Sequence, residues 1–212
     1  MTRRRYVTMA TPLFMVGFAL ALAQFGTVQA ASSGGGTAPA LDAVELVPTL
    51  HRINEMEIDA GKLAQKKGST QAMKDYGNKL QRDHQAADNQ LSAYAVEAKI
   101  DVNGSVPPPV ARNLQHAKEQ MKALENVNGE AFDRRFAEQM VHGHKGAIAM
   151  LDKSKSKITD PQLRALLAEL EPTLQSHEQV AANLLGEMHG VSTNEVSTPP
   201  TSAQGRSAPS TR

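Results

Sequence analysis

The sequence contains no cysteine and no tryptophan, and other aromatic residues are few among its 212 residues. Without cysteine, the chain can form no disulfide, thiolate metal site or iron–sulfur cluster. The net charge is also small, +1 at neutral pH, which argues against a dedicated nucleic-acid-binding protein. Alternating strand patterns are missing too, because apolar residues recur at steps of three and four along the central part. The chain is therefore predicted to be all-α.

The first 30 residues have the layout of a secretory signal peptide. Three arginines precede a long uncharged apolar run, and the small residues Val28 and Ala30 place a cleavage site after Ala30. Cleavage would remove three of the 23 basic residues and no acid, so the mature chain would carry a charge close to −2. We expect export to a bacterial periplasm or outer envelope. The alternative is an uncleaved segment that anchors the protein in the inner membrane, since the run is long enough to span a bilayer.

Composition divides the rest of the chain into three segments. Residues 31–42 are rich in Gly, Ala and Ser and are predicted to form a flexible linker. Residues 43–189 are predicted to form a single helical domain. Residues 190–212 contain almost no apolar side chains, and we expect them to be a disordered tail.

Breakers and caps divide the domain into five helices. Gly68 ends the first helix, and Ser69 or Thr70 caps the second. Asp160 and Pro161 are a strong N-cap and first residue for the last helix, and Pro172 should bend it. The predicted helices cover residues 48–67, 69–98, 110–126, 130–157 and 161–188.

The lengths of the connections predict how these helices are arranged. Two short turns make two antiparallel pairs from the four long helices. A connection of about thirty residues joins the pairs and contains the short helix. Such a connection can run the length of the bundle and place helix 130–157 parallel to helix 69–98. This is the one-crossover, ferritin-like arrangement of a four-helix bundle, with a short fifth helix in the crossover.

Each long helix carries an apolar stripe at alternating steps of three and four, the pattern of a buried seam. One polar residue interrupts each stripe near its middle: Glu57, His84, His144 and His177. With a rise of about 1.5 Å per residue, these four lie about 20 to 26 Å from one end of the bundle, within roughly one helical turn of each other. His142 is two positions from His144 and is therefore predicted to face water.

The four interrupting residues predict a metal site. Three imidazoles and a carboxylate can bind zinc, iron, manganese or copper. Asp83 is a further candidate ligand at the edge of the seam. No histidine has glutamate three residues before it, the pair that di-iron carboxylate bundles use, so a mononuclear site is predicted. The alternative is a structural network in which Glu57 accepts hydrogen bonds from the histidines, with water in the gaps.

Four pieces of the sequence together resemble a bacterial envelope family, domain of unknown function 4142. They are NEMEIDAGKLA (54–64), KLQRDHQAADNQL (79–91), FDRRFAEQMVHGHKGAI (132–148) and LEPTLQSHEQVAANL (170–184). The stretch MVHGHKGAIAM is also similar to a helix of a second ferritin-like family of unknown function, whose second histidine matches His144. The first resemblance, over about residues 43–188, implies a ferritin-like fold and an export route, and no established activity.

These observations leave two functional hypotheses. The first is an exported bundle that binds one divalent metal ion through its core. The second is a non-catalytic interaction or stress protein with a partner in the cell envelope, whose buried histidines are structural. An enzyme is less favoured, because the sequence has no nucleophile motif, phosphate loop or cofactor fingerprint. Membrane contact is expected only through an uncleaved signal segment, and no oligomeric state is predicted.

Overall fold

The computed structural model describes residues 39–194, and this range contains five α-helices and no β-strand. They are α1 (Ala43–Lys67), α2 (Gln71–Ala98), α3 (Pro108–Leu124), α4 (Gly129–Ser154) and α5 (Pro161–Asn194). The all-α prediction is thereby confirmed. The predicted signal peptide 1–30, most of the linker and the tail beyond residue 194 lie outside the described residues. Within the described range, no helix combines the length and apolar character that a bilayer span requires.

Helix α1 begins five residues before its predicted start at Pro48. Asp42 and Glu45 form a capping box there. The Glu45 N–H donates to Asp42 Oδ1 at 3.0 Å, and the Asp42 N–H donates to Glu45 Oε2 at 3.3 Å. Two otherwise unpaired N–H groups of the first turn are thereby satisfied. Pro48 consequently lies inside the helix rather than in its first turn, at the cost of one backbone hydrogen bond.

The other helix ends lie close to the predicted positions, with one exception. Thr70 caps α2 by accepting a hydrogen bond from the Met73 N–H at 3.2 Å, as the sequence indicated. Helix α5 contains Pro172 and extends to Asn194, past the predicted end at residue 188. The first residues of the segment predicted as a tail are therefore helical.

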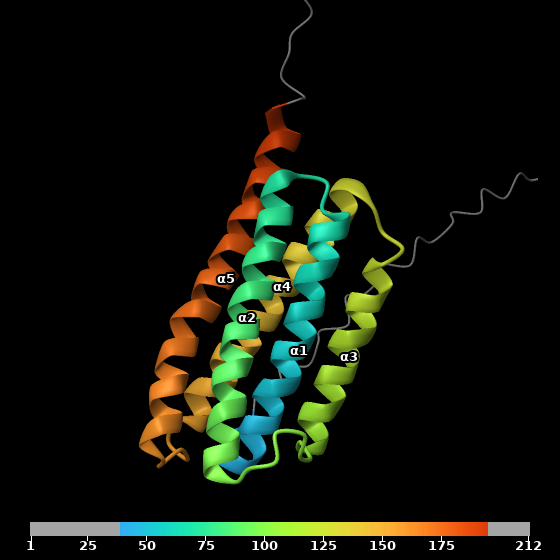
Figure 1. The fold of residues 1–212 in the computed structure, drawn as a ribbon. Coiled ribbons are helices and arrows are strands. Elements are labelled where there is room, and N and C mark those ends of the chain that lie inside the picture. Colours follow the sequence, from blue (N-terminus) through green and yellow to red (C-terminus); the bar gives the residue numbers. More distant parts are fainter. Residues whose placement is uncertain (1–38, 195–212) are drawn as a thin grey trace, which may run out of the picture. The chain divides into compact units, whose positions relative to one another are not determined.

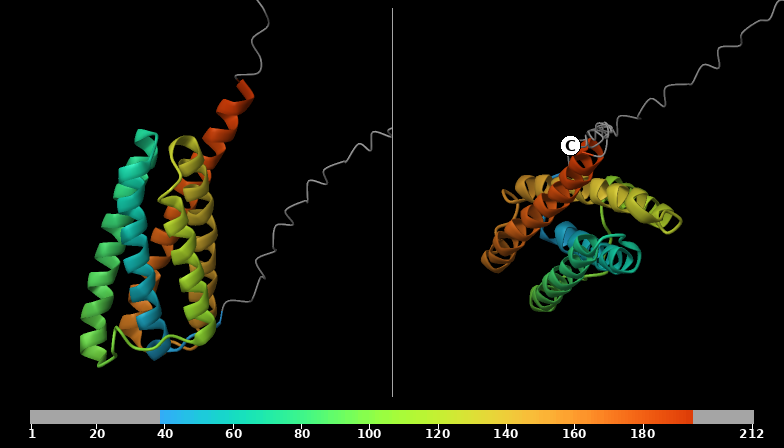
Figure 2. Two further views of the ribbon diagram at one scale, coloured as in Figure 1. Left: turned by 90° about the vertical axis from the view of Figure 1, so that its right-hand side faces the viewer. Right: turned by 90° about the horizontal axis from the view of Figure 1, so that it is seen from above.

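The helices form a bundle with one long crossover (Figures 1 and 2). In Figure 1, α1 runs upward, α2 runs down beside it, and α3 returns along the length of the bundle. Helix α4 then runs down, parallel to α2, and α5 runs up. Contacts join α1 to α2, α2 to α5, α5 to α4 and α4 to α1, while α3 packs against α1 and α4. This is the predicted ferritin-like topology, and each neighbouring pair in the ring is antiparallel.

Helices α1 and α2 approach each other closely at Gly61 and Gly77. A Cβ atom at Gly61 would lie 2.6 Å from the Gly77 carbonyl oxygen, and one at Gly77 would lie 2.6 Å from the Gly61 carbonyl oxygen. Real Cβ atoms do not approach backbone so closely, so only glycine fits at either position. Gly61 is one helical turn from Glu57, so this contact sets the separation of α1 and α2 beside the polar residues.

The apolar core is divided into two clusters, and the four polar seam residues lie between them. On α2, Leu80 belongs to one cluster and Leu91 to the other, with His84 between them. Helix α4 repeats the pattern with Met140, His144 and Ala147. The same holds for His177 on α5 and Glu57 on α1, and these four residues are called the polar layer below. Four helices therefore each contribute one polar residue at the same depth.

Candidate metal centre

Three histidines converge inside the polar layer. His84, His144 and His177 come from α2, α4 and α5, and their exposed fractions are 1%, 2% and 0%. One ring nitrogen from each lies within 4.8 Å of the corresponding nitrogen of the other two. The ring centroids are 5.2 to 5.8 Å apart. The three histidines therefore lie at one level of the core, as their spacing along the helices predicted.

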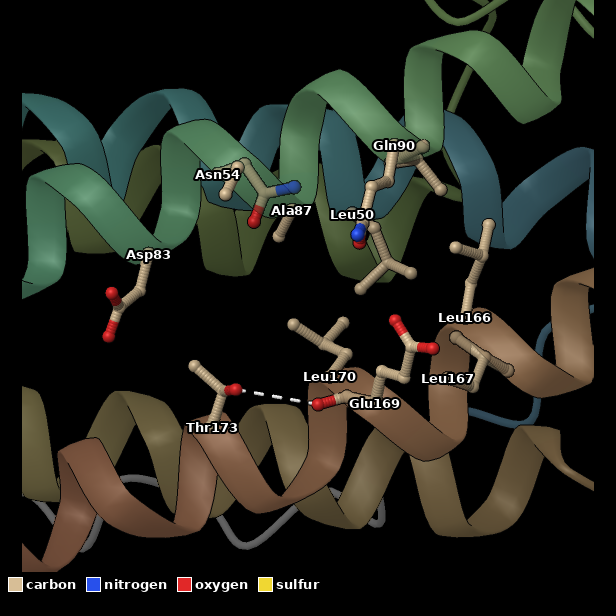
Figure 3. Close-up of a pocket in the computed structure, with 12 residues that line it drawn as sticks. Leu50, Asn54, Asp83, Ala87, Gln90, Leu166, Leu167, Glu169, Leu170 and Thr173 are labelled. Atoms are coloured by element: carbon tan, nitrogen blue, oxygen red, sulfur yellow. Dashed lines mark hydrogen bonds between the residues drawn. The ribbon is translucent and has the colours of Figure 1, made fainter.

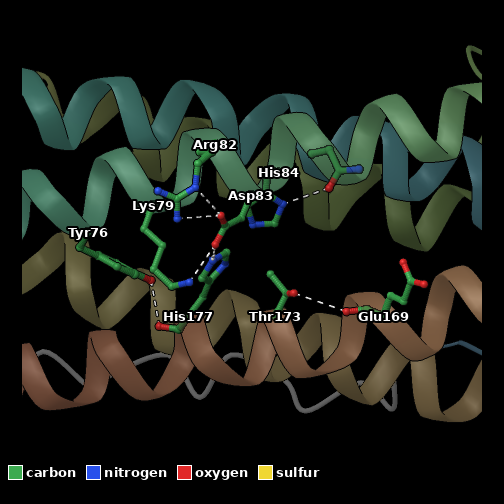
Figure 4. A network of polar contacts seen from close by, with 9 residues as sticks. Tyr76, Lys79, Arg82, Asp83, His84, Glu169, Thr173 and His177 are labelled. Carbon is green, nitrogen blue, oxygen red and sulfur yellow. Dashed lines mark hydrogen bonds and ion pairs between the residues drawn. The ribbon is translucent and has the colours of Figure 1, made fainter.

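The outer nitrogen of each histidine faces a hydrogen-bond acceptor (Figure 4 shows two of the three). His84 Nδ1 lies 3.0 Å from Asn54 Oδ1, and His144 Nδ1 lies 2.8 Å from the carbonyl oxygen of Met140. His177 Nε2 lies 3.0 Å from Asp83 Oδ2. A carbonyl or carboxylate oxygen accepts only, so each outer nitrogen must carry the proton and donate it.

The inner nitrogens have the opposite character. They are His84 Nε2, His144 Nε2 and His177 Nδ1, and all three are buried. Among the residues that the structure describes, none offers any of them a hydrogen bond. A neutral imidazole with its proton on one nitrogen has a lone pair on the other. Three lone pairs therefore point toward one small buried volume.

Burial keeps His84 and His177 neutral, and hydrogen bonds keep Asp83 ionised. Burial lowers the pKa of His84 to about 4, although the carboxylate of Glu57 opposes this shift. Burial also lowers the pKa of His177 to about 4, against the effect of its hydrogen bond to Asp83. Burial alone would raise the pKa of Asp83, but hydrogen bonds from Lys79 and His177 outweigh it and lower that pKa to about 2. Near neutral pH His84 and His177 are therefore neutral, and the Asp83 anion lies behind the ring of His177.

The two predicted carboxylate ligands have different positions from the histidines. Glu57 lies on α1 with its Oε2 atom buried and no hydrogen-bond partner among the described residues. Its charge acts on His84, but Glu57 does not belong to the group whose ligand atoms lie within 4.8 Å of each other. Asp83 lies outside the ring of His177 and accepts its Nε2–H, so it supports a candidate ligand in this structure instead of joining the three nitrogens.

A second carboxylate acts on the site from farther away. His51 Nδ1 lies 2.8 Å from Asp88 Oδ1, and Asn54 Nδ2 lies 3.5 Å from the same oxygen. Asn54 Oδ1 in turn accepts from His84. The chain His51–Asp88–Asn54–His84 fixes the orientation of the Asn54 amide, and with it the proton position on His84.

Sequence reasoning missed Asn54 and Asp88 as residues of this site. A signal was present, because Asn54 precedes Glu57 by three positions and Asp88 follows His84 by four. Side chains at these spacings lie on the same face of a helix. His142 is exposed, as predicted. Asp133 lies away from the site and is bonded to Ser69, just before the start of α2.

A cleft of about 250 Å³ lies beside the histidines, between α2 and α5 (Figure 3). Asn54 and Asp83 line it, and these are the residues that accept hydrogen bonds from His84 and His177. Leucines from α1, α2 and α5 and two alanines from α2 make up its apolar lining. We call this space the α2–α5 cleft.

Comparisons with known proteins agree with this fold. The crystal structure of a DUF305 fragment from Deinococcus radiodurans aligns with a TM-score of 0.59 and 16% sequence identity. The alignment covers 70% of this chain and 99% of that one, and at this identity it shows a shared fold alone. No curated protein matches the chain. A family model described as a domain of unknown function, DUF4142, matches residues 28–184, which confirms the resemblance seen in the sequence. The chain belongs to the DUF4142 family.

Proposed function

We propose that this protein is an exported bundle that binds a single divalent transition-metal ion through His84, His144 and His177. The observation that carries the proposal is the pattern of hydrogen bonds around the three rings. Every outer nitrogen is tied to an acceptor, and every inner nitrogen has a buried lone pair without a donor. Metal-bound histidines in proteins are supported in this way from outside.

The cost of burial favours a cation over an empty polar layer. Leaving a buried polar atom without a partner costs about 1–3 kcal/mol, and three such atoms lie together here. A purely structural network would need donors that point inward, and the neutral rings have used their protons on the outside. An ion that accepts three lone pairs removes the whole penalty.

Coordination requires only small movements of the rings. Bonds of about 2.0–2.1 Å to a tetrahedral ion place nitrogens about 3.3 Å apart. The inner nitrogens lie within 4.8 Å of each other, so rotations about the side-chain bonds can bring them to that spacing. Glu57 Oε2 is buried in the same layer and is the natural fourth ligand, and its negative charge would offset part of the charge of the ion. Imidazole ligands suit zinc, copper and iron better than manganese.

The test is metal binding by the mature chain without its predicted signal peptide. We expect one equivalent of Zn²⁺ or Co²⁺ in competition with a chromophoric chelator, and a tetrahedral Co²⁺ absorption spectrum. Alanine at His144 or His177 should abolish stoichiometric binding. His142→Ala, an exposed histidine on the same helix, is the matched control and should bind as the wild type does. A folded wild-type protein that binds no metal and shows no thermal shift with zinc, copper or iron would overturn the proposal in favour of a structural histidine network.

Export is a separate part of the proposal and needs its own experiment. It is supported by the basic, apolar and small-residue layout of residues 1–30. We expect the chain to be found in the periplasmic or envelope fraction of its cell with an N-terminus at residue 31. An intact N-terminus in the inner-membrane fraction would support the anchored alternative, and a cytoplasmic chain would contradict both.

A further inference from the structure

The three histidines are closed off from solvent in most directions. Their exposed fractions are 2% or less, and apolar clusters cover them toward both ends of the bundle. Toward α1 and α2, the backbone contact of Gly61 with Gly77 leaves no room for even a Cβ atom. An ion must therefore approach between other helices, or the bundle must open.

The α2–α5 cleft reaches the residues that accept hydrogen bonds from the outer nitrogens of His84 and His177. Asp83 and Asn54 line the cleft, and each is directly bonded to a histidine of the site at 3.0 Å. The volume of about 250 Å³ has room for several water molecules, and hence for an ion that keeps part of its hydration shell. Figure 4 shows Thr173 and Glu169 along α5 on one side of His177, where the cleft continues.

The charges of the cleft suit a cation. The charged side chains that line it are the carboxylates of Asp83 and Glu169, and no basic side chain lines it. Asp83 is paired with Lys79 and Arg82, while Glu169 is exposed and forms no ion pair among the described residues. Clefts lined by charges of one sign raise the local concentration of counter-ions and their rate of association.

We propose that the α2–α5 cleft is the route by which the metal ion enters and leaves the three-histidine site, with Glu169 as the carboxylate that first attracts it and Asp83 as the last carboxylate before the histidines. This inference rests on the proposed function. An ion held by Asp83 is separated from the inner nitrogens by the ring of His177 alone, since Asp83 bonds the outer nitrogen of that ring. Rotation of the His177 side chain then lets the ion pass from Asp83 to the inner nitrogens.

A route affects the rates of binding and release equally and leaves the equilibrium unchanged, which makes the inference testable. Ala87 and Thr173 line the cleft from opposite helices and hold none of the hydrogen bonds around the histidines. The double variant Ala87→Leu/Thr173→Leu should fill the cleft. We expect the rates of Zn²⁺ uptake and release, followed by stopped-flow with a chelating dye, to fall at least tenfold with Kd unchanged within threefold. Ala149→Leu, at an exposed position of α4, is the control and should leave both rates unaltered.

A charge variant at the mouth of the cleft gives a second test that does not depend on repacking. Glu169→Lys should slow uptake severalfold at low ionic strength, and added salt should reduce the difference because it screens exposed charges. Glu187→Lys makes the same charge change at an exposed site farther along α5. It should have little effect.

The outcomes separate the two proposals. A wild-type chain that binds no metal overturns the proposed function and this route together. A chain that binds metal, whose cleft variants exchange it at wild-type rates, overturns the route and leaves the function standing. Equal slowing by Glu169→Lys and Glu187→Lys would also overturn the route, because only the total charge of the protein would then matter.

Discussion

Asn54 on α1 accepts a hydrogen bond from His84 on α2, with 3.0 Å between Asn54 Oδ1 and His84 Nδ1. The other end of the same amide lies against Asp88, at 3.5 Å. An asparagine with its nitrogen held by a carboxylate has only one way to face the histidine, with its oxygen. The distant carboxylate thereby sets which nitrogen of His84 carries the proton.

Asn54→Ala should weaken metal binding without removing a ligand. The His84 ring would lose the acceptor that holds its proton on Nδ1, so its inner nitrogen would no longer be a permanent acceptor. Loss of such a supporting group typically costs about 10–100-fold in metal affinity. Chelator competition measures the affinity, and ¹⁵N chemical shifts of the His84 ring report the proton position. Asn113→Ala, at an exposed position of α3, is the control, and an unchanged affinity and proton position in Asn54→Ala would refute this role.

Gly61→Ala should destabilise the bundle, whereas Gly143→Ala and Gly146→Ala should stabilise it. The added methyl group at Gly61 would overlap the backbone of α2, and overpacking of this kind costs about 1–3 kcal/mol. Cβ atoms at Gly143 and Gly146 would meet nothing within 4 Å, so replacing a helical glycine there gains about 0.4–1 kcal/mol. Urea unfolding followed by circular dichroism gives the difference. A Gly61→Ala variant as stable as Gly143→Ala would contradict the close contact.

The metal-free protein should lose stability as the pH falls from 6.5 to about 4. The pKa of both His84 and His177 is lowered from 6.5 to about 4 in the folded state, so in this interval the unfolded chain binds more protons. The contribution of these two histidines to the free energy of unfolding is complete above pH 6.5 and falls as the pH drops through the interval. Below pH 4 they cause no further loss. At about 1.4 kcal/mol for each unit of pKa, the loss is on the order of 3 kcal/mol for each histidine.

Unfolding in urea across this pH range, with chelator present, measures the loss. His177→Gln should reduce the slope between pH 6.5 and 4, while His142→Gln, at an exposed position, should leave it unchanged. Identical slopes in all three proteins would show that the buried rings do not govern the acid response.

Asp133→Ala should destabilise the fold and leave metal affinity intact. The Asp133 carboxylate accepts from the N–H and the hydroxyl of Ser69 at 2.9 and 2.7 Å, so α4 holds the turn between α1 and α2. Removing it leaves a partly buried N–H without a partner, at a cost of about 1–3 kcal/mol. Asp133→Asn keeps one acceptor oxygen and should lose less. Thermal unfolding measures the effect, and a drop in metal affinity beyond threefold would contradict the separation of Asp133 from the site.

The topology and the convergence of the three histidines could be predicted because both depend on counting along helices. The lengths of the connections determined which helices are parallel, and the rise per residue determined the depth of His84 against His144. The start of α1 was misplaced because Pro48 is a stronger local signal than the capping box of Asp42 and Glu45.

The partners of the rings could not be predicted in the same way. Whether Asp83 faces the ion or supports His177 depends on the rotation of α2 about its axis by a few tens of degrees, which an apolar stripe determines only coarsely. The role of Asn54 depends on a side chain from a second helix meeting Asp88, a tertiary contact without a sequence period. The charge of Glu57 acts on His84, but the direction of the Glu57 side chain is set by rotamer choice, which the sequence does not reveal.

The division of the apolar core into two clusters has a consequence for cooperativity. Each cluster is held together by its own apolar contacts, whereas the inner nitrogens of the imidazoles between the clusters form no hydrogen bond among the described residues. Without an ion, we expect amide protons at the two ends of the bundle to exchange in independent opening events. An ion bound by α2, α4 and α5 would link these helices at the middle of the bundle. Neither end could then open before the other, and the protein would unfold in a single cooperative transition.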